Sequence, residues 1–394
     1  MGKWIGCLMA AAVAAGAVAD DWYTWRGPTA DGISKETGLK PTSAKKIWTK
    51  ELGVGYSAVG VKDGRLYTMG HADGVDTVYC LEAATGATIW NYSYDCETGK
   101  YKGPRATPVI NDGKVYTVSR TGLLICFDEG SGKKRWETDV LAETNNKDSR
   151  WGWGISTSAV IEGDLILLNI GAAGTAVDKH TGKIKWTSSG LQSYASPVVF
   201  NHRGKRLAAI FSAPGLLLVD AQTGAEAGRY EWKTKYDING ADPVIIGDRI
   251  YISSAYKSGC AMLDFSSGKL EPLWESDLMN NQFSTSIHID GYIYGVDGHV
   301  KNKGFLRCVD AKDGAEQWSK PIGFGSLIAA DGQLIVLDEK GTLFFAKIDP
   351  DKYVEVATFE TGLAKLCWTP PVLANGIVYC RNDKGTLVAI DVSQ

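Results

Sequence analysis

The stretch Leu81-Glu82-Ala83-Ala84-Thr85-Gly86, followed four residues later by Trp90, recurs along this chain of 394 residues. Copies occupy residues 127–132 with Trp136, 177–182 with Trp186, 219–224, 263–268, and 309–314 with Trp318. The closing glycines of these copies, from 86 to 314, lie about 46 residues apart on average, a spacing typical of propeller blades. The repeat therefore predicts an array of similar β-sheet units.

Each unit also has an earlier half. Thr107-Pro108-Val109-Ile110 leads through the turn Asn111-Asp112-Gly113 to a second apolar strand, and the turn Thr121-Gly122 precedes the third. Gly and Asn-Asp-Gly segments between short β-branched runs are typical of antiparallel hairpins. With the Trp-bearing strand, each unit has four antiparallel strands, which is one propeller blade.

Two more units, residues 326–348 and 369–390, keep the earlier half and lack the Trp signature. The last unit stops at Gln394 without a fourth strand, whereas residues 44–49 have the form of one. Such strand donation closes a ring and removes its open sheet edges. We therefore predict an all-β fold, an eight-bladed β-propeller of four-stranded antiparallel blades over residues 44–394, closed by an N-terminal strand.

The first 19 residues have the pattern of a signal peptide. Lys3 precedes an apolar run, and Ala17-Val18-Ala19 has the form of a cleavage site. We expect cleavage after Ala19, a lead-in segment over residues 20–43, and a periplasmic or secreted protein. Cys7 lies at the start of the apolar run, a poor position for lipid attachment.

Seven cysteines follow this segment. Cys80, Cys126 and Cys308 occupy the same point of the repeat, which favours small buried strand residues over disulfides. Cys96 and Cys367 fall in connections and are the better candidates if any disulfide forms.

Composition excludes several classes of protein. Charged residues make up 22% and hydrophobic residues 44% of the chain, and the net charge is −3. These values argue against a disordered chain, a membrane-spanning protein and a nucleic-acid binder.

The Asp-x-x-Thr-Gly turn and its Trp have a structural explanation. Asp accepts hydrogen bonds from the following N–H groups, Gly supplies a positive φ, and Trp packs between sheets. This pattern resembles the tryptophan-docking repeat of pyrroloquinoline-quinone-type β-propellers. That family includes the quinoprotein alcohol dehydrogenases and the BamB-type scaffold of outer-membrane assembly, which is the closer in size.

The resemblance implies two alternatives. A dehydrogenase would need pyrroloquinoline quinone with calcium, and such enzymes often carry a vicinal disulfide; this chain has no adjacent cysteines and no C-x-x-C-H haem motif. The sequence does not decide whether the protein is an enzyme, although these absences argue against it. We expect an exported non-catalytic binding or scaffold propeller with no cofactor; the alternative is a quinone-dependent dehydrogenase that oxidises alcohols or sugars.

The expected partner is an envelope protein or peptide, with a small planar ligand or a saccharide as further options, and the chain is expected to be a monomer. Aligning the blades gives a candidate site, because residues three positions before Pro108 and its equivalents should ring one mouth of the channel. They are Tyr56, Arg105, Ile155, Tyr194, Gly240, Phe283, Phe324 and Trp368. Aromatic walls with Arg105 as a polar anchor would suit a planar ligand or a peptide side chain. Alternatively, these side chains only wedge between inner strands.

Two more residues are candidates at the same mouth. Asp242 is the one charged residue in the next ring of positions, and its other explanation is a turn before Pro243. Trp153, in the segment Trp151-Gly152-Trp153-Gly154, either extends the face or packs between blades. No catalytic or metal-binding residues are predicted.

Overall fold

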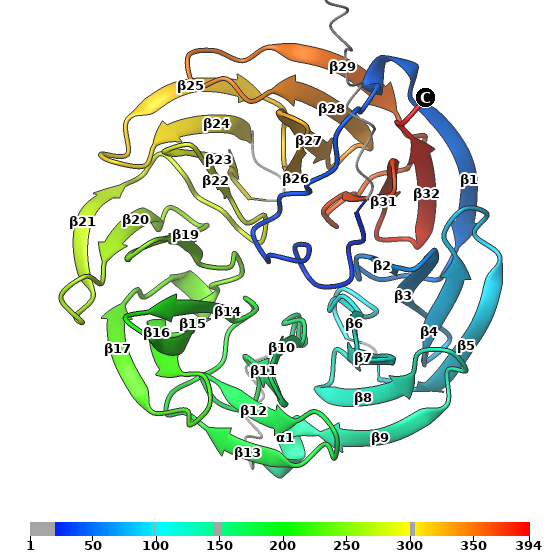
Figure 1. Ribbon diagram of the computed structural model, residues 1–394, viewed down its shortest axis with the longest axis horizontal. Coiled ribbons are helices and arrows are strands. Elements are labelled where there is room, and N and C mark those ends of the chain that lie inside the picture. The colour runs from blue at the N-terminus through cyan, green and yellow to red at the C-terminus, as the bar shows by residue number, and fades with distance from the viewer. Residues whose placement is uncertain (1–19, 98, 145–151, 300–303) are drawn as a thin grey trace, which may run out of the picture.

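Eight four-stranded antiparallel sheets surround a central channel in the residues that the structure describes, as Figure 1 shows. The computed structural model describes residues 20–394 except 98, 145–151 and 300–303. The expected signal segment and Cys7 therefore lie outside the described residues. The predicted eight-bladed β-propeller is confirmed.

The blades follow one another around the ring, each with its first strand innermost (Figure 1). Their strands are β2 (Gly60–Lys62), β3 (Arg65–Ala72), β4 (Val75–Glu82) and β5 (Thr88–Asp95); β6 (Val109–Asn111), β7 (Lys114–Val118), β8 (Leu123–Asp128) and β9 (Lys134–Asp139); β10 (Val160–Glu162), β11 (Leu165–Leu168), β12 (Thr175–Asp178) and β13 (Ile184–Thr187); β14 (Val198–His202), β15 (Lys205–Ser212), β16 (Gly215–Asp220) and β17 (Glu226–Glu231); β18 (Val244–Ile246), β19 (Arg249–Ser254), β20 (Gly259–Asp264) and β21 (Glu271–Ser276); β22 (Ile287–Ile289), β23 (Tyr292–Asp297), β24 (Phe305–Asp310) and β25 (Glu316–Pro321); β26 (Gly325–Ala330), β27 (Gln333–Asp338), β28 (Thr342–Lys347) and β29 (Glu355–Glu360); and β30 (Val372–Ala374), β31 (Ile377–Arg381), β32 (Thr386–Asp391) and β1 (Lys45–Glu51). The helical elements are α1 (Val140–Glu143), η1 (Pro41–Ser43) and η2 (Lys235–Asp237).

The N-terminal strand closes the ring. Strand β1 pairs antiparallel with β32, from Lys45 opposite Asp391 to Glu51 opposite Thr386, and supplies the fourth strand of the last blade. Figure 1 shows the blue strand β1 beside the red strand β32. The N-terminal strand thus completes the last blade, as the sequence predicted.

Tryptophans on the outer strands dock on the glycine turn of the next blade, as seen for Trp48, Trp90, Trp136, Trp186 and Trp274. The indole N–H of Trp90 on β5 donates to the carbonyl of Glu129 at 3.0 Å, and a Cβ added to Gly132 would lie 2.6 Å from the Trp90 ring. The same donation recurs from Trp48, Trp136, Trp274 and Trp318 to Ala83, Lys179, Ala311 and Asp349. The repeat thus links neighbouring blades, and Gly is required for both its φ and its lack of a side chain.

The acidic residue of the repeat holds its own turn. The carboxylate of Asp128 accepts from the backbone N–H and hydroxyl of Ser131, and it pairs with Arg135. The Arg135 guanidinium and then the Ser131 donors hold the pKa of Asp128 well below its ordinary value. The repeated carboxylates are therefore structural groups.

Replacing Gly132 by Ala is expected to destabilise the propeller by about 3 kcal/mol, since strain at a positive φ adds to overpacking against Trp90. Gly113 is a matched control: its φ is 69°, as at Gly132, but an added Cβ would contact nothing within 4 Å. Gly113→Ala should cost only about 1 kcal/mol. Urea denaturation followed by circular dichroism measures both, and equal losses would contradict docking.

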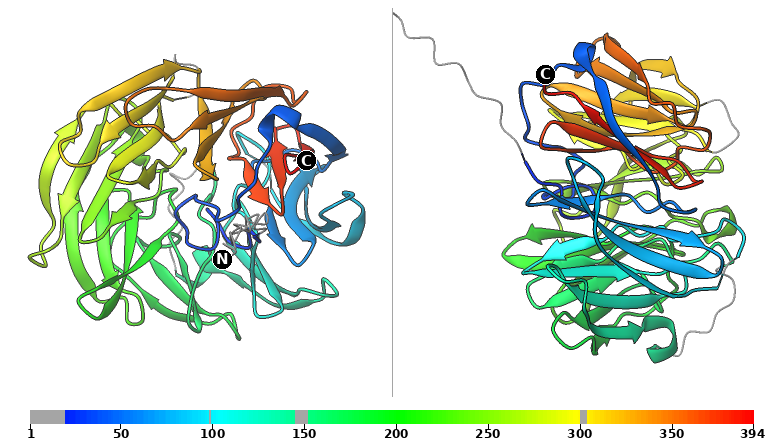
Figure 2. Two further views of the ribbon diagram at one scale, coloured as in Figure 1. Left: turned by 45° about the horizontal axis from the view of Figure 1, so that its top comes forward. Right: turned by 90° about the vertical axis from the view of Figure 1, so that its right-hand side faces the viewer.

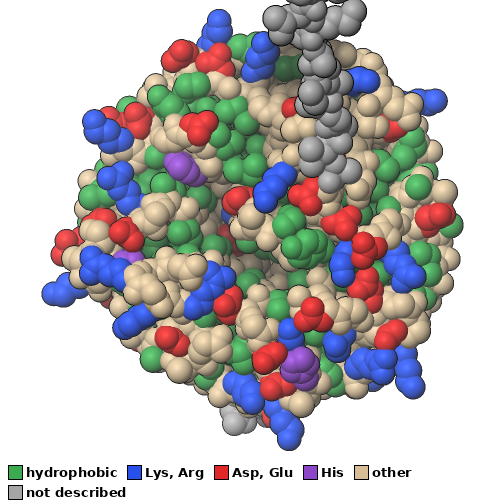
Figure 3. Space-filling model, in the orientation of Figure 1, with side chains coloured by type: hydrophobic (Ala, Val, Ile, Leu, Met, Phe, Trp, Pro, Cys, Tyr) green, Lys and Arg blue, Asp and Glu red, His purple; other side chains and the backbone are tan. Residues whose placement is uncertain are grey.

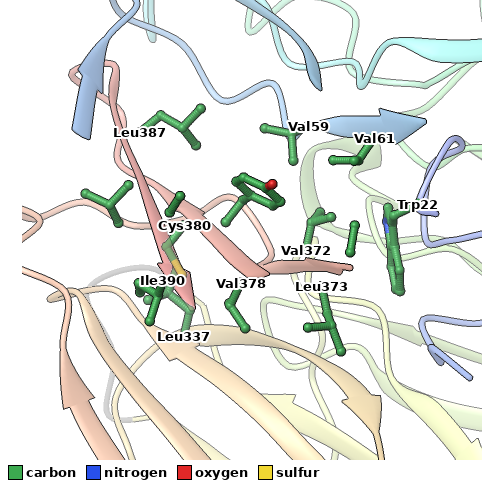
Figure 4. Packing of buried hydrophobic residues seen from close by; sticks show 14 of the residues in the cluster. Trp22, Val59, Val61, Leu337, Val372, Leu373, Val378, Cys380, Leu387 and Ile390 are labelled. Atoms are coloured by element: carbon green, nitrogen blue, oxygen red, sulfur yellow. The ribbon is translucent and has the colours of Figure 1, made fainter. Parts of the chain in front are cut away.

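The core lies in layers between neighbouring blades. Figure 4 shows one layer, in which Val61 of the first blade and Val372 and Leu373 of the last lie near Trp22, while Val378 and Leu387 lie farther along the same layer. Cys80, Cys126 and Cys308 are fully buried, as predicted. Cys96 and Cys367 are free and buried rather than disulfide-bonded, so their suggested pairing is wrong. Cys367 belongs to the apolar layer between the first and last blades, whereas Cys96 lies near the polar side chains of Asp76 and Thr121.

The lead-in segment, residues 20–43, crosses one face of the ring and is bonded to several blades (Figures 1 and 2). Trp22 exchanges backbone hydrogen bonds with Val61, and the Ser34 N–H donates to Ala329. Figure 3 shows this face, where acidic and basic side chains are intermingled. Among the described residues, no helix is long and apolar enough to cross a bilayer.

Candidate functional site

A pocket of about 220 Å³ opens at one mouth of the central channel. Eight of the ten candidate positions named above line it. They are Tyr56, Arg105, Trp153, Tyr194, Gly240, Asp242, Phe283 and Trp368. The other two, Ile155 and Phe324, are buried. Phe324 lies behind Phe283, with ring centroids 5.0 Å apart, and Ile155 packs in the core between the second and third blades.

The pocket opens away from the face that the lead-in crosses, although Trp25 of the lead-in reaches its floor. Tyr56 precedes strand β2, whereas the lead-in bonds to Val61 within that strand. At about 3.3 Å of rise per residue, five residues separate the two levels by roughly 16 Å. The repeat therefore places the equivalent positions of the blades near this mouth, although the side chains of Ile155 and Phe324 are buried there.

Aromatic rings form the wall of the pocket. Tyr56 and Trp368 are stacked, with centroids 5.6 Å apart and planes at 17°. Phe283 lies 5.7 Å from Trp368, and Trp153 lies 6.2 Å from Tyr194 on the other side. The aromatic side chains at the channel mouth thus contact one another, as the packing alternative expected. They also leave an apolar pocket between them.

Arg105 supplies a positive charge to this wall. Its guanidinium donates to the carbonyls of Gly103 at 2.9 Å and Tyr101 at 2.5 Å and lies 5.6 Å from the Tyr56 ring centre. Burial, followed by the nearby Arg120 charge, lowers the pKa of Arg105 to about 10. The group remains charged at neutral pH, and within the described residues it forms no ion pair.

Asp242 and Trp25 form the floor. The Trp25 indole N–H donates to Asp242 Oδ2 at 2.6 Å, and the Ser196 N–H donates to Oδ1 at 2.7 Å. Burial raises the pKa of Asp242, and the neighbouring Arg26 charge opposes that rise. Asp242 therefore connects the lead-in to the ring through hydrogen bonds. This role adds to its position in the turn before Pro243.

Sequence reasoning missed Trp25 and the rim of the pocket. Tyr101, Tyr256 and Gln282 also line it, and Tyr236 stands edge-on to Trp153 at 6.3 Å. Tyr101 and Tyr236 lie in connections between blades, and Tyr256 lies in the β19–β20 connection of its own blade. The sequence signal available was an aromatic residue in each of these polar connections.

The pocket does not fit the quinone and calcium of the dehydrogenase alternative. Its lining contains one carboxylate, Asp242, and both oxygens of that group already accept protein hydrogen bonds. Across the described part of the chain, no three His, Cys, Asp or Glu side chains gather to hold a metal ion. A volume of about 220 Å³ is also below the range of about 300–1,000 Å³ usual for small-molecule sites.

Fold and site together define an eight-bladed propeller of the pyrroloquinoline-quinone-like repeat class, with an aromatic pocket at one channel mouth. The family model described as outer membrane protein assembly factor BamB matches residues 37–100, 93–320 and 302–394. The chain belongs to this family.

Individual relatives agree with this assignment. The outer membrane protein assembly factor BamB of Moranella endobia is 24% identical over 335 residues, which cover 80% of this chain and 71% of that protein. The crystal structure of BamB from Moraxella catarrhalis matches with a TM-score of 0.65 at 16% identity, covering 88% of this chain and 97% of that one. Quinohemoprotein alcohol dehydrogenase from Comamonas testosteroni matches with a TM-score of 0.71 at 14% identity, covering 95% and 80%. At these identities the structures show the shared fold alone.

Proposed function

We propose that this protein is a non-catalytic scaffold that acts in the assembly of outer-membrane proteins by binding protein partners at the channel mouth. The observation that carries the proposal is the pocket itself, which has aromatic walls, an arginine without an ion pair to any described residue, and a floor closed by Trp25. Such a surface can anchor a side chain of a partner. The family assignment supports the process in which the partner acts.

The proposal includes an envelope location and a monomeric state. Residues 1–19 have the signal pattern described above. Cleavage after Ala19 would leave the lead-in in place across one face of the ring. Trp22 and Glu36 of that lead-in are buried, with Glu36 accepting from the N–H groups of Asn375 and Gly376 at 2.7 Å each. The mature chain thus has a complete, closed propeller for a single subunit.

In-cell photo-cross-linking tests the proposal. A photoreactive phenylalanine analogue in place of Tyr236, which is 59% exposed at the rim, should cross-link to a component of the outer-membrane assembly machinery. The matched control is the same analogue at Leu273, which is 48% exposed on the outer strand β21. Equal cross-linking from both positions, or none from Tyr236, would contradict a scaffold that acts through this mouth.

A titration separates the scaffold from the dehydrogenase. Pyrroloquinoline quinone with calcium, added to the purified mature chain, is expected to give no saturable change in tryptophan fluorescence, because the donor set around Asp242 is already used. Saturable binding at micromolar concentration, lost in Arg105→Ala, would favour the dehydrogenase instead. Dye-linked oxidation of alcohols or sugars would be the corresponding activity.

A further inference from the structure

The rim of the pocket carries tyrosines held in an unusual backbone conformation. Tyr101, Tyr236 and Tyr256 have φ values of 58°, 69° and 61°, a region that non-glycine residues rarely adopt. Tyr236 stands edge-on to Tyr256 at 5.7 Å, and Tyr101 lies 6.0 Å from Trp368. The backbone thus keeps aromatic rings at the edge of the mouth, where strained residues often serve a function.

Each of these tyrosines is next to an exposed lysine. Lys100 and Lys102 flank Tyr101, Lys235 precedes Tyr236, and Lys257 follows Tyr256. Within the described residues, none of these four lysines takes part in a salt bridge.

The rim segments that carry these tyrosines are net positive. Residues 99–105, 234–238 and 255–258 contain five basic residues, including Arg105, and one acidic residue, Asp237. The Asp242 carboxylate at the floor lies near Arg26 and is hydrogen-bonded to Trp25, and Asp383 and Asp76 act on Tyr56 and Arg105. These three rim segments therefore bring positive charge to the edge of an apolar pocket, although the whole chain is slightly acidic.

The size of the pocket limits what enters it. Its volume of about 220 Å³ suits one large side chain better than a drug-sized molecule, for which about 300–1,000 Å³ is usual. Aromatic anchors that fill such pockets dominate many protein interfaces, and complementary charges around them set the choice of partner.

We propose that the channel mouth binds an acidic peptide segment of a protein partner, with one aromatic side chain inserted between Trp368, Phe283 and Tyr194. Aspartate or glutamate residues on either side of that anchor contact the rim lysines and Arg105. This inference rests on the proposed scaffold function and specifies the chemistry of its partner. Stacking against the wall provides affinity, and the lysines select acidic sequences.

Selection from a phage library of random 12-residue peptides on the immobilised mature chain tests this inference. We expect enrichment of peptides with an aromatic residue flanked by acidic residues. The synthetic consensus peptide, measured by isothermal titration calorimetry, should bind at least about tenfold more weakly when its aromatic residue is replaced by Ala or when the salt is raised from 50 to 500 mM.

Variants of the chain locate the binding. Lys100→Gln, Lys102→Gln, Lys235→Gln and Lys257→Gln combined should weaken the consensus peptide at least about tenfold and flatten its salt dependence. Tyr236→Ala should weaken binding of the consensus peptide about fivefold. Tyr236 is exposed, so this substitution should leave the fold intact. Leu273→Ala and Lys133→Gln, exposed away from the mouth, should have no effect.

Several results would overturn the inference. They are enrichment of basic or non-aromatic peptides, equal enrichment on the Tyr236→Ala chain, or no enrichment while an anionic oligosaccharide such as tetragalacturonate binds in the same titration. If the peptide result fails while Tyr236 still cross-links to the assembly machinery, the scaffold function stands without this partner chemistry. Peptide binding without that cross-link would count against the scaffold function alone.

Discussion

Arg381→Met is expected to lower the free energy of unfolding by at least about 3 kcal/mol, the largest effect of any single substitution considered. Arg381 ends strand β31 of the last blade and is 1% exposed. Its guanidinium donates to the carbonyls of Ser57, Met69 and Gly53 at 2.9, 2.6 and 3.1 Å, all in the first blade or just before it. Removing it leaves several buried acceptors without donors at the seam that closes the ring.

Urea denaturation followed by circular dichroism measures this effect. Arg249→Met is the matched control, because Arg249 begins strand β19 with its side chain exposed. It should change stability by less than about 0.5 kcal/mol. If Arg381→Met were as mild as Arg249→Met, ring closure would not depend on the Arg381 hydrogen bonds.

Asp242→Ala is also expected to cost about 3 kcal/mol, because it removes a buried carboxylate whose charge acts on the buried Arg26. Arg26 is 8% exposed, and the Asp242 charge opposes the lowering of its pKa by burial. The substitution also removes the acceptor of the Trp25 indole N–H and of the Ser196 N–H. Both the lead-in and the pocket floor lose their common anchor.

A double-mutant cycle isolates this coupling. Asp242→Ala in an Arg26→Met background should cost less than in the natural chain, because no buried charge is then left uncompensated. Asp248→Ala, at an exposed carboxylate 3.1 Å from the His202 ring nitrogen, is a surface control expected to cost less than about 1 kcal/mol. Strict additivity of the Arg26 and Asp242 changes would show that the two charges do not interact.

The blade repeat could be predicted because its causes are local. The pattern consists of a Gly turn, an alternating strand and an Asp that accepts hydrogen bonds from its own turn. Each of these acts within a few residues, so the pattern can be recognised in every copy. Strand donation by residues 44–49 followed from counting strands. The docking of Trp90 on Gly132 of the next blade could be predicted only in part. The sequence indicates that Trp90 packs between sheets, but it does not identify Gly132 as the residue that Trp90 contacts.

The candidate site was predicted where it follows the repeat and missed where it does not. Alignment of blades placed Tyr56 and Trp368 at one mouth, because equivalent positions share a level in a propeller. Trp25 reaches Asp242 across 217 positions of sequence, and no periodicity encodes that contact. Phe324 was placed in the ring by the same alignment, but it is buried behind Phe283.

The most direct test of the central claim is the amount of folded integral outer-membrane proteins in cells that lack this chain. Deletion should lower that amount, and the natural chain and its Leu273→Ala variant should restore it. Restoration should be incomplete with Arg105→Ala combined with Tyr236→Ala, provided that the variant accumulates normally. Unchanged outer-membrane proteins on deletion, together with loss of a quinone-dependent alcohol or sugar oxidation, would contradict the scaffold and assign the propeller to the dehydrogenases.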